Sequence, residues 1–347
     1  MSILKTGHNM YCMEAFSSRT IVAILYRCRR QFLIALLVIA CSYTSLVQAT
    51  ERALLIGVSN YVFMPVNSLS GPKNDVRLIK EMLIAKGFSS ENIAILADGV
   101  ADSSKQPTKK NIIDSFEKLA TNTQESDSVF VYFSGHGSQQ LSVISEGNVE
   151  PDQLDEMFLP MDAKKGETYA KNVLLDNEIN ILLKNIHSRA RFVMAVFDFC
   201  HSGTATRSSE AGVAYRDVPS ESLVSDGDIQ KKLKTLRIEN KFKLNTVSVI
   251  DLYPKNMMAL FATQPDQKEP ERVRKIKIGG QEDWNTVGQL TYHLILAANK
   301  PEVKNYQDLK AYLSNAYAAE MKTKKMSKPL PTPLFEGEMS EPVLWNR

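Results

Sequence analysis

The sequence predicts an α/β fold in which a mostly parallel β-sheet is covered by helices on both faces. Two observations indicate this fold. Short apolar runs alternate along the chain with amphipathic segments of helical spacing. Two of these runs, in Val129–Gln139 and Phe192–Gly203, end in small polar turns, as buried parallel strands do. In such sheets the loops beyond the carboxyl ends of the strands form the active crevice.

The first half of the chain follows this alternation. Arg52–Ser59 and Asn92–Leu96 predict strands. Asn74–Lys86 predicts a helix that ends at Gly87, and a second helix follows Pro107. The apolar residues that define the two helical faces are Val76, Ile79, Met82 and Leu83 in the first helix and Ile112, Ile113, Phe116 and Leu119 in the second.

The second half is less regular. Asp176 predicts the N-cap of a helix with Ile179, Leu182, Leu183 and Ile186 on one face. Residues 204–256 lack steady periodicity and predict a flexible loop or insertion. Regular structure resumes at Met258–Thr263, followed by helices over residues 288–298 and 306–321 and a last strand near Pro342–Trp345. The basic clusters Arg272–Lys277 and Lys322–Lys328 are expected to be solvated loops.

Residues 1–49 have the features of a signal peptide. Arg27, Arg29 and Arg30 precede the apolar stretch FLIALLVIACSYTSL, which is followed by an A-x-A-like cleavage site at Val47–Ala49. The apolar stretch falls short of the roughly 20 residues of a membrane span. We therefore expect cleavage after Ala49 and a periplasmic or secreted domain over residues 50–347, without a stable membrane span. The alternatives are an uncleaved anchor and lipid attachment at Cys41.

The charge balance does not favour nucleic acids as partners. The chain has 42 Lys and Arg against 39 Asp and Glu, and the signal segment contains five of the basic residues and one of the acids. The remaining chain is therefore close to neutral, which gives no support for nucleic-acid binding.

The cysteines are Cys12, Cys28, Cys41 and Cys200, and only the last lies outside the signal segment. A lone cysteine in an exported protein has no disulfide partner within the chain, so it is either a reactive thiol or an inert buried one. The flanking Asp198, His201 and Gly203 favour a turn and a reactive thiol.

His136 is the expected partner of Cys200. If the two strands that precede them are neighbours, the imidazole can take the proton of the thiol and return it to a leaving amine. The N–H groups of Gly137 and Cys200 are suited to an oxyanion hole. The alternative is that His136 merely ends a strand. The weaker candidates are His187 at a helix end, His201 in the same turn as the thiol, and His293 within a packed helix.

Seven strings together resemble a known family. They are, in order, ALLIGVSNY, LSGPKNDV, VYFSGHGSQ, DEMFLPMD, FDFCHSG, ALFATQPDQ and GQLTYHLI. The chain resembles the caspase-hemoglobinase fold and, within it, the metacaspase-like cysteine peptidases of bacterial type, over Glu51–Arg347. The Q-A-C-x-G signature of eukaryotic caspases is absent, since Phe199 precedes Cys200 and His201 follows it. The resemblance implies a His136/Cys200 dyad that hydrolyses peptide bonds through a thioester acyl-enzyme.

The resemblance also implies a substrate specificity. Asp198 matches an acid of the primary pocket, Asp75 resembles a second acid, and Ser134 lies between them. Buried carboxylates need a cationic partner, so these acids would select Arg or Lys. The alternative for Asp75 is a first-turn acid that complements a helix dipole.

Calcium is an optional cofactor on the same reasoning. Relatives that need the ion use acids that match Asp155 and a pair that matches Asp176 and Asn177, with a further acid where this chain has Arg207. Calcium prefers six to eight oxygen ligands, so an amide and a cation at these places weaken the site. We expect that no cofactor is required. Asp155, Glu156 and Asp162 alternatively cap turns.

The sequence thus predicts an exported cysteine endopeptidase that cuts protein or peptide substrates after Arg or Lys. The alternatives are a caspase-fold peptidase of other specificity and an inactive caspase-fold module that binds peptides or proteins. The basic residues of the 204–256 segment also predict self-cleavage, at Arg207, at Arg216 or within Lys231–Lys234, because exposed irregular loops are preferred sites of proteolysis.

Overall fold

A computed structural model describes the chain over residues 26–27, 29, 31, 49–64, 66–99, 106–142, 153–200, 213–240, 256–264, 267–278, 281–324, 326 and 329–346. The chain divides into two units, Met1–Gln48 and Ala49–Arg347. Most of the predicted signal peptide, with Cys41, lies outside the described residues. Among the residues that the structure describes, no helix has both the length and the apolar character needed to cross a membrane.

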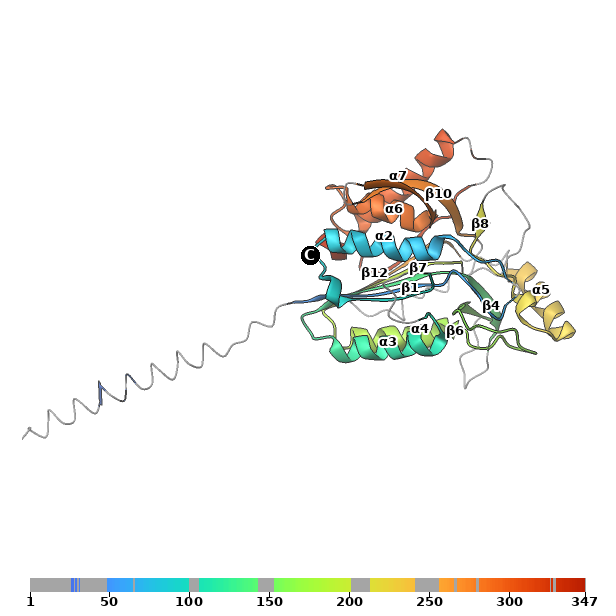
Figure 1. Cartoon of the computed structure of the whole chain (residues 1–347), viewed down its shortest axis with the longest axis horizontal. Helices are drawn as coiled ribbons and strands as arrows, with labels where there is room; N and C mark the ends of the chain where they lie inside the picture. The colour runs from blue at the N-terminus through green and yellow to red at the C-terminus, as the bar shows by residue number, and fades with distance from the viewer. Residues whose placement is uncertain are drawn as a thin grey trace, which may run out of the picture. The chain divides into compact units, whose positions relative to one another are not determined.

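The second unit contains a central sheet with the strand order β12-β9-β7-β3-β1-β2. All neighbours in this sheet are parallel except β12, which runs antiparallel to β9. Two three-stranded sheets, β11-β10-β8 and β4-β5-β6, accompany it (Figure 1). The strands are β1 (Glu51–Gly57), β2 (Ile93–Ala97), β3 (Ser128–Ser134), β4 (Gly137–Leu141), β5 (Leu154–Phe158), β6 (Leu174–Leu175), β7 (Phe192–Asp198), β8 (Ala214–Tyr215), β9 (Met257–Phe261), β10 (Pro270–Ile278), β11 (Gln281–Gly288) and β12 (Leu334–Gly337).

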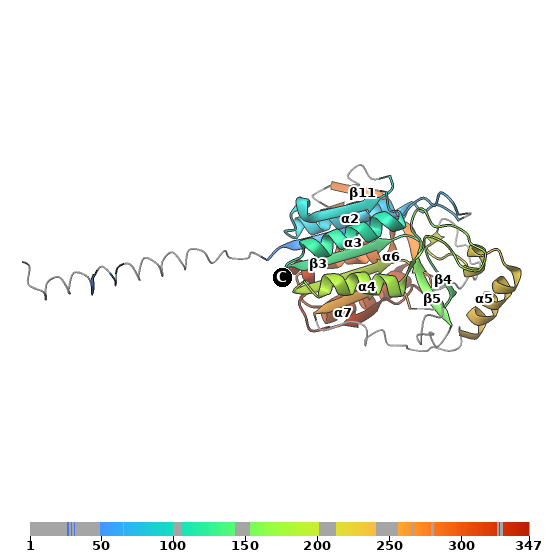
Figure 2. The ribbon, with the colours of Figure 1, turned by 90° about the horizontal axis from the view of Figure 1, so that it is seen from below.

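Helices cover both faces of the central sheet. The helices are α2 (Gly71–Ala85), α3 (Lys109–Asn122), α4 (Asp176–His187), α5 (Gly227–Asn240), α6 (Gln289–Ala298) and α7 (Tyr306–Thr323). Helices α2, α6 and α7 lie on one face and α3 and α4 on the other, where they run side by side (Figures 1 and 2). Strands β3 and β7 are buried at every position because both of their faces are covered. The predicted α/β class is confirmed.

The register of β3 and β7 fixes the place of the two polar turns. Ser134 pairs with Asp198 at the carboxyl ends of these adjacent parallel strands. Gly57 of β1 pairs with Ser134 from the other side. The turn after β3 and the turn after β7 therefore meet at the same edge of the sheet, as the sequence predicts.

Local sequence explains where the helices begin and end. Helix α2 starts at Gly71, three residues earlier than expected, because Pro72 in its first turn has the φ of a helix and needs no N–H acceptor. It stops before Gly87, which has a φ of +99°. The Thr108 side chain accepts the Asn111 N–H to cap α3, and Asp162 accepts the Lys109 N–H at 2.8 Å.

The prediction of Asp176 as an N-cap is wrong. Asp176 is the first residue of α4, and Leu175 precedes the helix in an extended conformation. The exposed N–H of Leu175 is instead accepted by Glu178 Oε2 at 3.0 Å. A carboxylate three residues into the helix thus does the capping that the sequence assigned to Asp176.

The prediction of an irregular stretch over residues 204–256 is wrong for the part that the structure describes. Residues 213–240 contain β8, a 3-10 turn at Ser220–Leu223 and α5. Among the described side chains of α5, Leu233 and Leu236 are buried, and they pack on Leu141, Leu154 and Val224. So few apolar positions give no periodicity that could be recognised.

Two further expectations are corrected. Arg272–Lys277 lies in β10, paired along its length with β11, rather than in a loop. The last strand is β12, not Pro342–Trp345, and residues Leu344–Asn346 form a 3-10 turn. Val343, Leu344 and Trp345 are buried in the core beside α7, so their apolar character reflects packing and not strand pairing.

Glu336 on β12 should make stability depend on pH. Burial raises the pKa of Glu336 from 4.5 to about 7. Because the folded state binds this proton more tightly than the unfolded state does, the stabilisation is present below pH 4.5 and is lost as the pH rises to 7. At pH 8, Glu336→Gln should raise the free energy of unfolding by about 1–3 kcal/mol.

Urea denaturation of the parent and Glu336→Gln at pH 5 and pH 8 measures this difference. Glu338→Gln is the matched control, since Glu338 is exposed just beyond the same strand. Equal effects of the two substitutions at both pH values would contradict the assignment.

Candidate active site

His136 and Cys200 each lie two residues beyond the end of their strand, β3 and β7. The two turns pack against each other without room for a side chain between them. A Cβ placed on Gly137 would lie 1.9 Å from the Cys200 carbonyl oxygen, so only glycine fits there.

His136 is held by its backbone and by one ring nitrogen. Its N–H donates to the Tyr61 hydroxyl at 2.6 Å, and its Nε2 lies 2.9 Å from the Asn67 carbonyl oxygen. A carbonyl only accepts, so Nε2 carries the proton and the buried Nδ1 has the free lone pair. Burial lowers the pKa of His136, and the Asn67 and Arg216 carbonyls oppose this effect. The ring is therefore a neutral base.

Cys200 is a free thiol that solvent does not reach. The Glu269 N–H donates to its Sγ. Burial, followed by the negative charge of Asp217, raises the pKa of Cys200 well above the ordinary value of a thiol. The thiol is thus protonated in the state that the structure describes.

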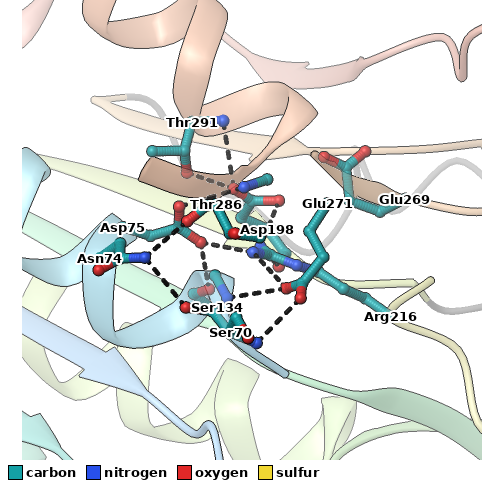
Figure 3. Close-up of polar contacts among 12 residues, drawn as sticks. Ser70, Asn74, Asp75, Ser134, Asp198, Arg216, Glu269, Glu271, Thr286 and Thr291 are labelled. Carbon is teal, nitrogen blue, oxygen red and sulfur yellow. Dashed lines mark hydrogen bonds and ion pairs between the residues drawn. The ribbon is translucent and has the colours of Figure 1, made fainter. Parts of the chain in front are cut away.

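A buried arginine occupies an acidic cluster beside this pair (Figure 3). The cluster is formed by Asp75 of α2, Asp198 of β7 and Glu271 of β10. Arg216 Nη2 lies 2.5 Å from Asp75 Oδ2 and 3.6 Å from Glu271 Oε2. Arg216 Nη1 lies 2.9 Å from Asp198 Oδ1 and donates to the Asp198 carbonyl at 2.8 Å. The guanidinium and the carboxylates are almost completely buried.

Each carboxylate has further donors that fix its position. Asp75 accepts the Ser134 hydroxyl at 2.8 Å and the Gly288 N–H at 3.1 Å. Asp198 accepts the Thr291 N–H at 3.1 Å and the Tyr132 hydroxyl at 3.2 Å. Glu271 accepts the Ser70 and Gly71 N–H groups at 2.9 and 3.0 Å. The acids are therefore oriented by the scaffold and not by the arginine alone.

Two glycines leave the space that the guanidinium fills. A Cβ on Gly71 would lie 2.5 Å from Arg216 Nη2, and a Cβ on Gly288 would lie 2.6 Å from Arg216 Nη1. Any larger residue at either position would compete with the cation for this space.

Electrostatics keep Arg216 charged. Burial lowers its pKa, but Asp198, Asp75 and Glu271 raise it by more, so the net pKa lies well above the ordinary value. Burial raises the pKa of Asp75 to about 7, against the opposing effect of Arg216. Burial and the nearby charge of Asp198 also raise the pKa of Glu269, whose carboxyl accepts the Leu290 N–H at 2.9 Å.

The backbone of Arg216 also meets the candidate catalytic residues. The Gly137 N–H donates to the Arg216 carbonyl at 2.9 Å, and the Arg216 N–H donates to the Glu269 carbonyl at 3.0 Å. Of the two N–H groups predicted for an oxyanion hole, Gly137 thus already binds a carbonyl oxygen. Such a donor next to a thiol can stabilise the charge that forms on an attacked carbonyl.

The structure brings together Asp75, Asp198 and Ser134, which the sequence singled out. Asp75 is the fifth residue of α2 and is completely buried, so the alternative of a first-turn acid on the helix dipole does not apply. Sequence reasoning missed Asn67, Tyr61 and Glu271 and treated Arg216 only as a cleavage candidate. The available signal for Glu269 and Glu271 was the string EPERV, in which a single proline separates two acids immediately before a β-like run.

The other candidates lie elsewhere. His187 ends α4, and the buried His293 of α6 pairs with Glu320 Oε2 at 2.9 Å. His201, Gly203 and Arg207 lie outside the described residues.

The described residues do not fit a calcium ion. Asp155 lies in β5 opposite Gln140 of β4, and Asp176 starts α4. Within the described ranges, no three His, Cys, Asp or Glu residues are grouped as a metal site requires. No step below uses the ion.

The chain is similar in sequence to known peptidases. Residues 51–208 match the family described as metacaspase, peptidase C14 domain. Metacaspase-1 of Candida albicans is 34% identical over 156 residues, which are 44% of this chain and 33% of that protein. Metacaspase-1 of Yarrowia lipolytica is 36% identical over 156 residues, 45% of this chain and 32% of that protein. The chain thus spans about a third of the length of these relatives.

One solved structure shows the same fold. Protein GSU0716 from Geobacter sulfurreducens superposes with a TM-score of 0.51 and 19% identity, covering 83% of this chain and 94% of that chain. At this identity the likeness concerns the fold alone.

Removal of the buried cation should destabilise the chain in a pH-dependent way. Arg216→Met, made in Cys200→Ala to exclude cleavage, leaves buried carboxylates without a partner and should lower the free energy of unfolding by about 3–5 kcal/mol at pH 8. At pH 5 the loss should be smaller, because buried acids without a cation have raised pKa values and the folded state takes up protons.

Chemical denaturation at the two pH values measures both effects. The control is Arg77→Met, because the Arg77 side chain is 43% exposed and pairs with Glu81 on the surface of α2. It should cost less than about 1 kcal/mol at either pH. A similar loss for the two variants would show that the buried cluster does not depend on Arg216.

Proposed function

Residues 51–208 of this chain match the metacaspase, peptidase C14 domain, and from this match we propose that the protein is a cysteine endopeptidase that cuts after Arg or Lys. The match confirms the resemblance to metacaspase-like peptidases, and the bacterial type stays a prediction. One observation supports the finer proposal. An arginine of the chain itself lies in the acidic cluster while its carbonyl accepts the Gly137 N–H beside Cys200.

In the proposed mechanism His136 and Cys200 act as a dyad. His136 Nδ1 takes the thiol proton, and the thiolate forms a bond to the scissile carbonyl carbon. The resulting oxyanion is stabilised by the N–H groups of Gly137 and Cys200. Collapse breaks the C–N bond, and the leaving amine receives the proton from His136. Water then hydrolyses the thioester, which releases the carboxylate and restores the thiol.

The acidic cluster supplies the specificity in this proposal. Asp75 and Asp198, with Ser134 holding Asp75, lie on one side of the bound guanidinium. A desolvated carboxylate strongly prefers a cationic partner, so Arg and Lys side chains are favoured over neutral or acidic ones. The proposed substrates are therefore proteins and peptides with Arg or Lys immediately before the bond that is cut.

The seated Arg216 also selects one bond among the predicted self-cleavage sites. Lys231, Lys232 and Lys234 are exposed on α5 and would have to leave the helix to enter the site. The side chain of Arg216 already lies in the cluster, and its carbonyl already accepts the Gly137 N–H. We therefore propose Arg216–Asp217 as the bond that the enzyme cuts in itself, and that the uncut segment blocks other substrates.

Two proposals concern conditions in the cell. Export follows from the signal-like residues 1–49, and N-terminal sequencing of the mature protein for Thr50 tests it. The second proposal is that activity needs no metal cofactor, so equal activity in EDTA and in added calcium is the expected result.

The dyad predicts non-additive kinetics. Cys200→Ala should abolish hydrolysis of an arginyl peptide, and His136→Ala should lower kcat to nearly the same floor. Since the two residues act as one unit, the double variant should be no slower than Cys200→Ala alone. Initial rates at equal protein concentrations measure this, and alkylation of the thiol gives the active-site concentration of the parent and of His136→Ala. Substantial hydrolysis by Cys200→Ala would exclude the nucleophile, whereas alkylation without any hydrolysis in the parent would favour the binding module.

The acidic cluster predicts the substrate preference. Profiling of a peptide library should show cleavage after Arg or Lys, and Asp198→Asn should lower kcat/KM for arginyl peptides by about 100-fold or more, since it removes a buried counter-charge. Glu91→Gln, at an exposed position next to β2 and outside the cluster, is the control. Equal cleavage after Leu and after Arg by the parent would overturn the specificity.

Self-cleavage at Arg216–Asp217 predicts a fragment with a defined N-terminus. Incubation of the parent should yield a fragment that begins at Asp217, and neither Cys200→Ala nor Arg216→Gln should yield it. Edman sequencing or mass spectrometry of the fragments identifies the end. A fully active parent that stays intact, or that is cut only within Lys231–Lys234, would exclude this bond.

A further inference from the structure

The segment Ala214–Val218 is bound through its backbone on two sides. Ala214 and Tyr215 pair antiparallel with Glu271 and Pro270 of β10. On the other side the Gly137 N–H donates to the Arg216 carbonyl, and the Val218 N–H donates to the Gly137 carbonyl at 3.0 Å. A peptide held in this way adds a strand to the sheet edge, with the side chains left to determine specificity.

This arrangement locates the residue that follows the cut bond. The Arg216 carbonyl lies on the candidate oxyanion donor, so the next residue, Asp217, belongs to the leaving side. The charge of Asp217 acts on both reacting groups, because it raises the pKa of Cys200 and opposes the lowering of the pKa of His136. The backbone of Asp217 also forms an isolated parallel bridge with Gly137, the residue after His136.

One cation meets the Asp217 side chain. Lys268 Nζ lies 2.6 Å from Asp217 Oδ2, and the two side chains are only 17% and 4% exposed. The same Nζ lies 5.9 Å from the ring centre of Tyr215, the residue before Arg216. Lys268 directly precedes Glu269, whose N–H donates to Cys200 Sγ, so its backbone is fixed relative to the thiol.

We propose that Lys268 is a specificity-determining residue that favours Asp or Glu immediately after the bond that is cut. This inference rests on the proposed function of the site. A largely buried carboxylate beside Lys268 is stabilised by the ion pair, whereas a basic residue in the same place would put two cations in contact. The segment Ala214–Val218 of the chain itself has this pattern, since Asp217 follows Arg216.

A merely structural role makes a different prediction. If Lys268 only holds the uncut segment in place, its charge affects folding and self-cleavage but not the choice among peptides added from outside. The discriminating measurement is therefore the ratio of kcat/KM for two peptides that differ only in the residue after Arg.

The two peptides are Val-Ala-Tyr-Arg-Asp-Val-Pro, which copies the segment, and the same peptide with Asn in place of Asp, which adds no second bond for an enzyme that cuts after Arg or Lys. The parent should favour the Asp peptide by about 10-fold, the size expected for one partly buried charge pair. Lys268→Glu should reverse the order, and Lys268→Arg should keep it. Lys275→Glu, an exposed lysine of β10 that pairs with Glu282, should leave the ratio unchanged.

A Tyr-Arg arylamide separates the two hypotheses, because it has no residue after the cut bond. No hydrolysis of the arylamide by the parent contradicts the proposed function itself. Hydrolysis of the arylamide together with equal rates for the two peptides, or a ratio that Lys268→Glu does not change, overturns the role of Lys268 alone. If Lys268→Glu fails to fold, Lys268→Met decides, since loss of the charge should bring the ratio close to one.

Discussion

The burial of several carboxylates around one cation is the constraint on which this end of the molecule depends. Asp75, Asp198 and Glu271 come from α2, β7 and β10, which are far apart in sequence. Three acids without solvent would repel one another and lose their hydration, so such a cluster persists only with a partner of opposite charge or with protons in its place. Arg216 is that partner in the uncut chain. The backbone donors around each acid keep the cluster in shape, which is what a recognition site for a guanidinium requires.

The cluster also joins the two parts of the second unit. The part that matches the metacaspase family supplies Asp75, Ser134 and Asp198. Beyond it, β10 supplies Glu271, and the start of α6 supplies donors to Asp198 and Glu269. The turns that carry His136 and Cys200 thus belong to the family-matching part, while the surroundings of the buried Arg216 side chain are completed by residues that follow that part in sequence. A domain cut at residue 208 would lack one wall of its own site.

The sequence predicted the central sheet well because its strands are apolar on both faces, and parallel strands align their carboxyl ends. That alignment predicted His136 and Cys200 at one edge, and Ser134 and Asp198 end the same two strands. The roles of Glu271 and Arg216 in the cluster were not predicted, for a physical reason. Their roles depend on tertiary pairing of charges, and neither lies in a segment with strong periodicity. The apolar residues near Trp345 were assigned to a strand by mistake. A short apolar run is produced both by burial in the core and by strand pairing, so the sequence does not distinguish the two.

Occupation of the site by its own segment affects reactivity as well as access. With the segment in place, burial raises the pKa of the thiol and lowers that of the imidazole, and the carboxylate of Asp217 adds to the first effect. Departure of the segment would readmit water and remove that carboxylate, and both changes lower the pKa of Cys200. The contacts that present Arg216–Asp217 to the dyad therefore also keep the thiol protonated. On this proposal a single strand of the chain serves as first substrate and as inhibitor, and the step from one state to the other needs no other protein.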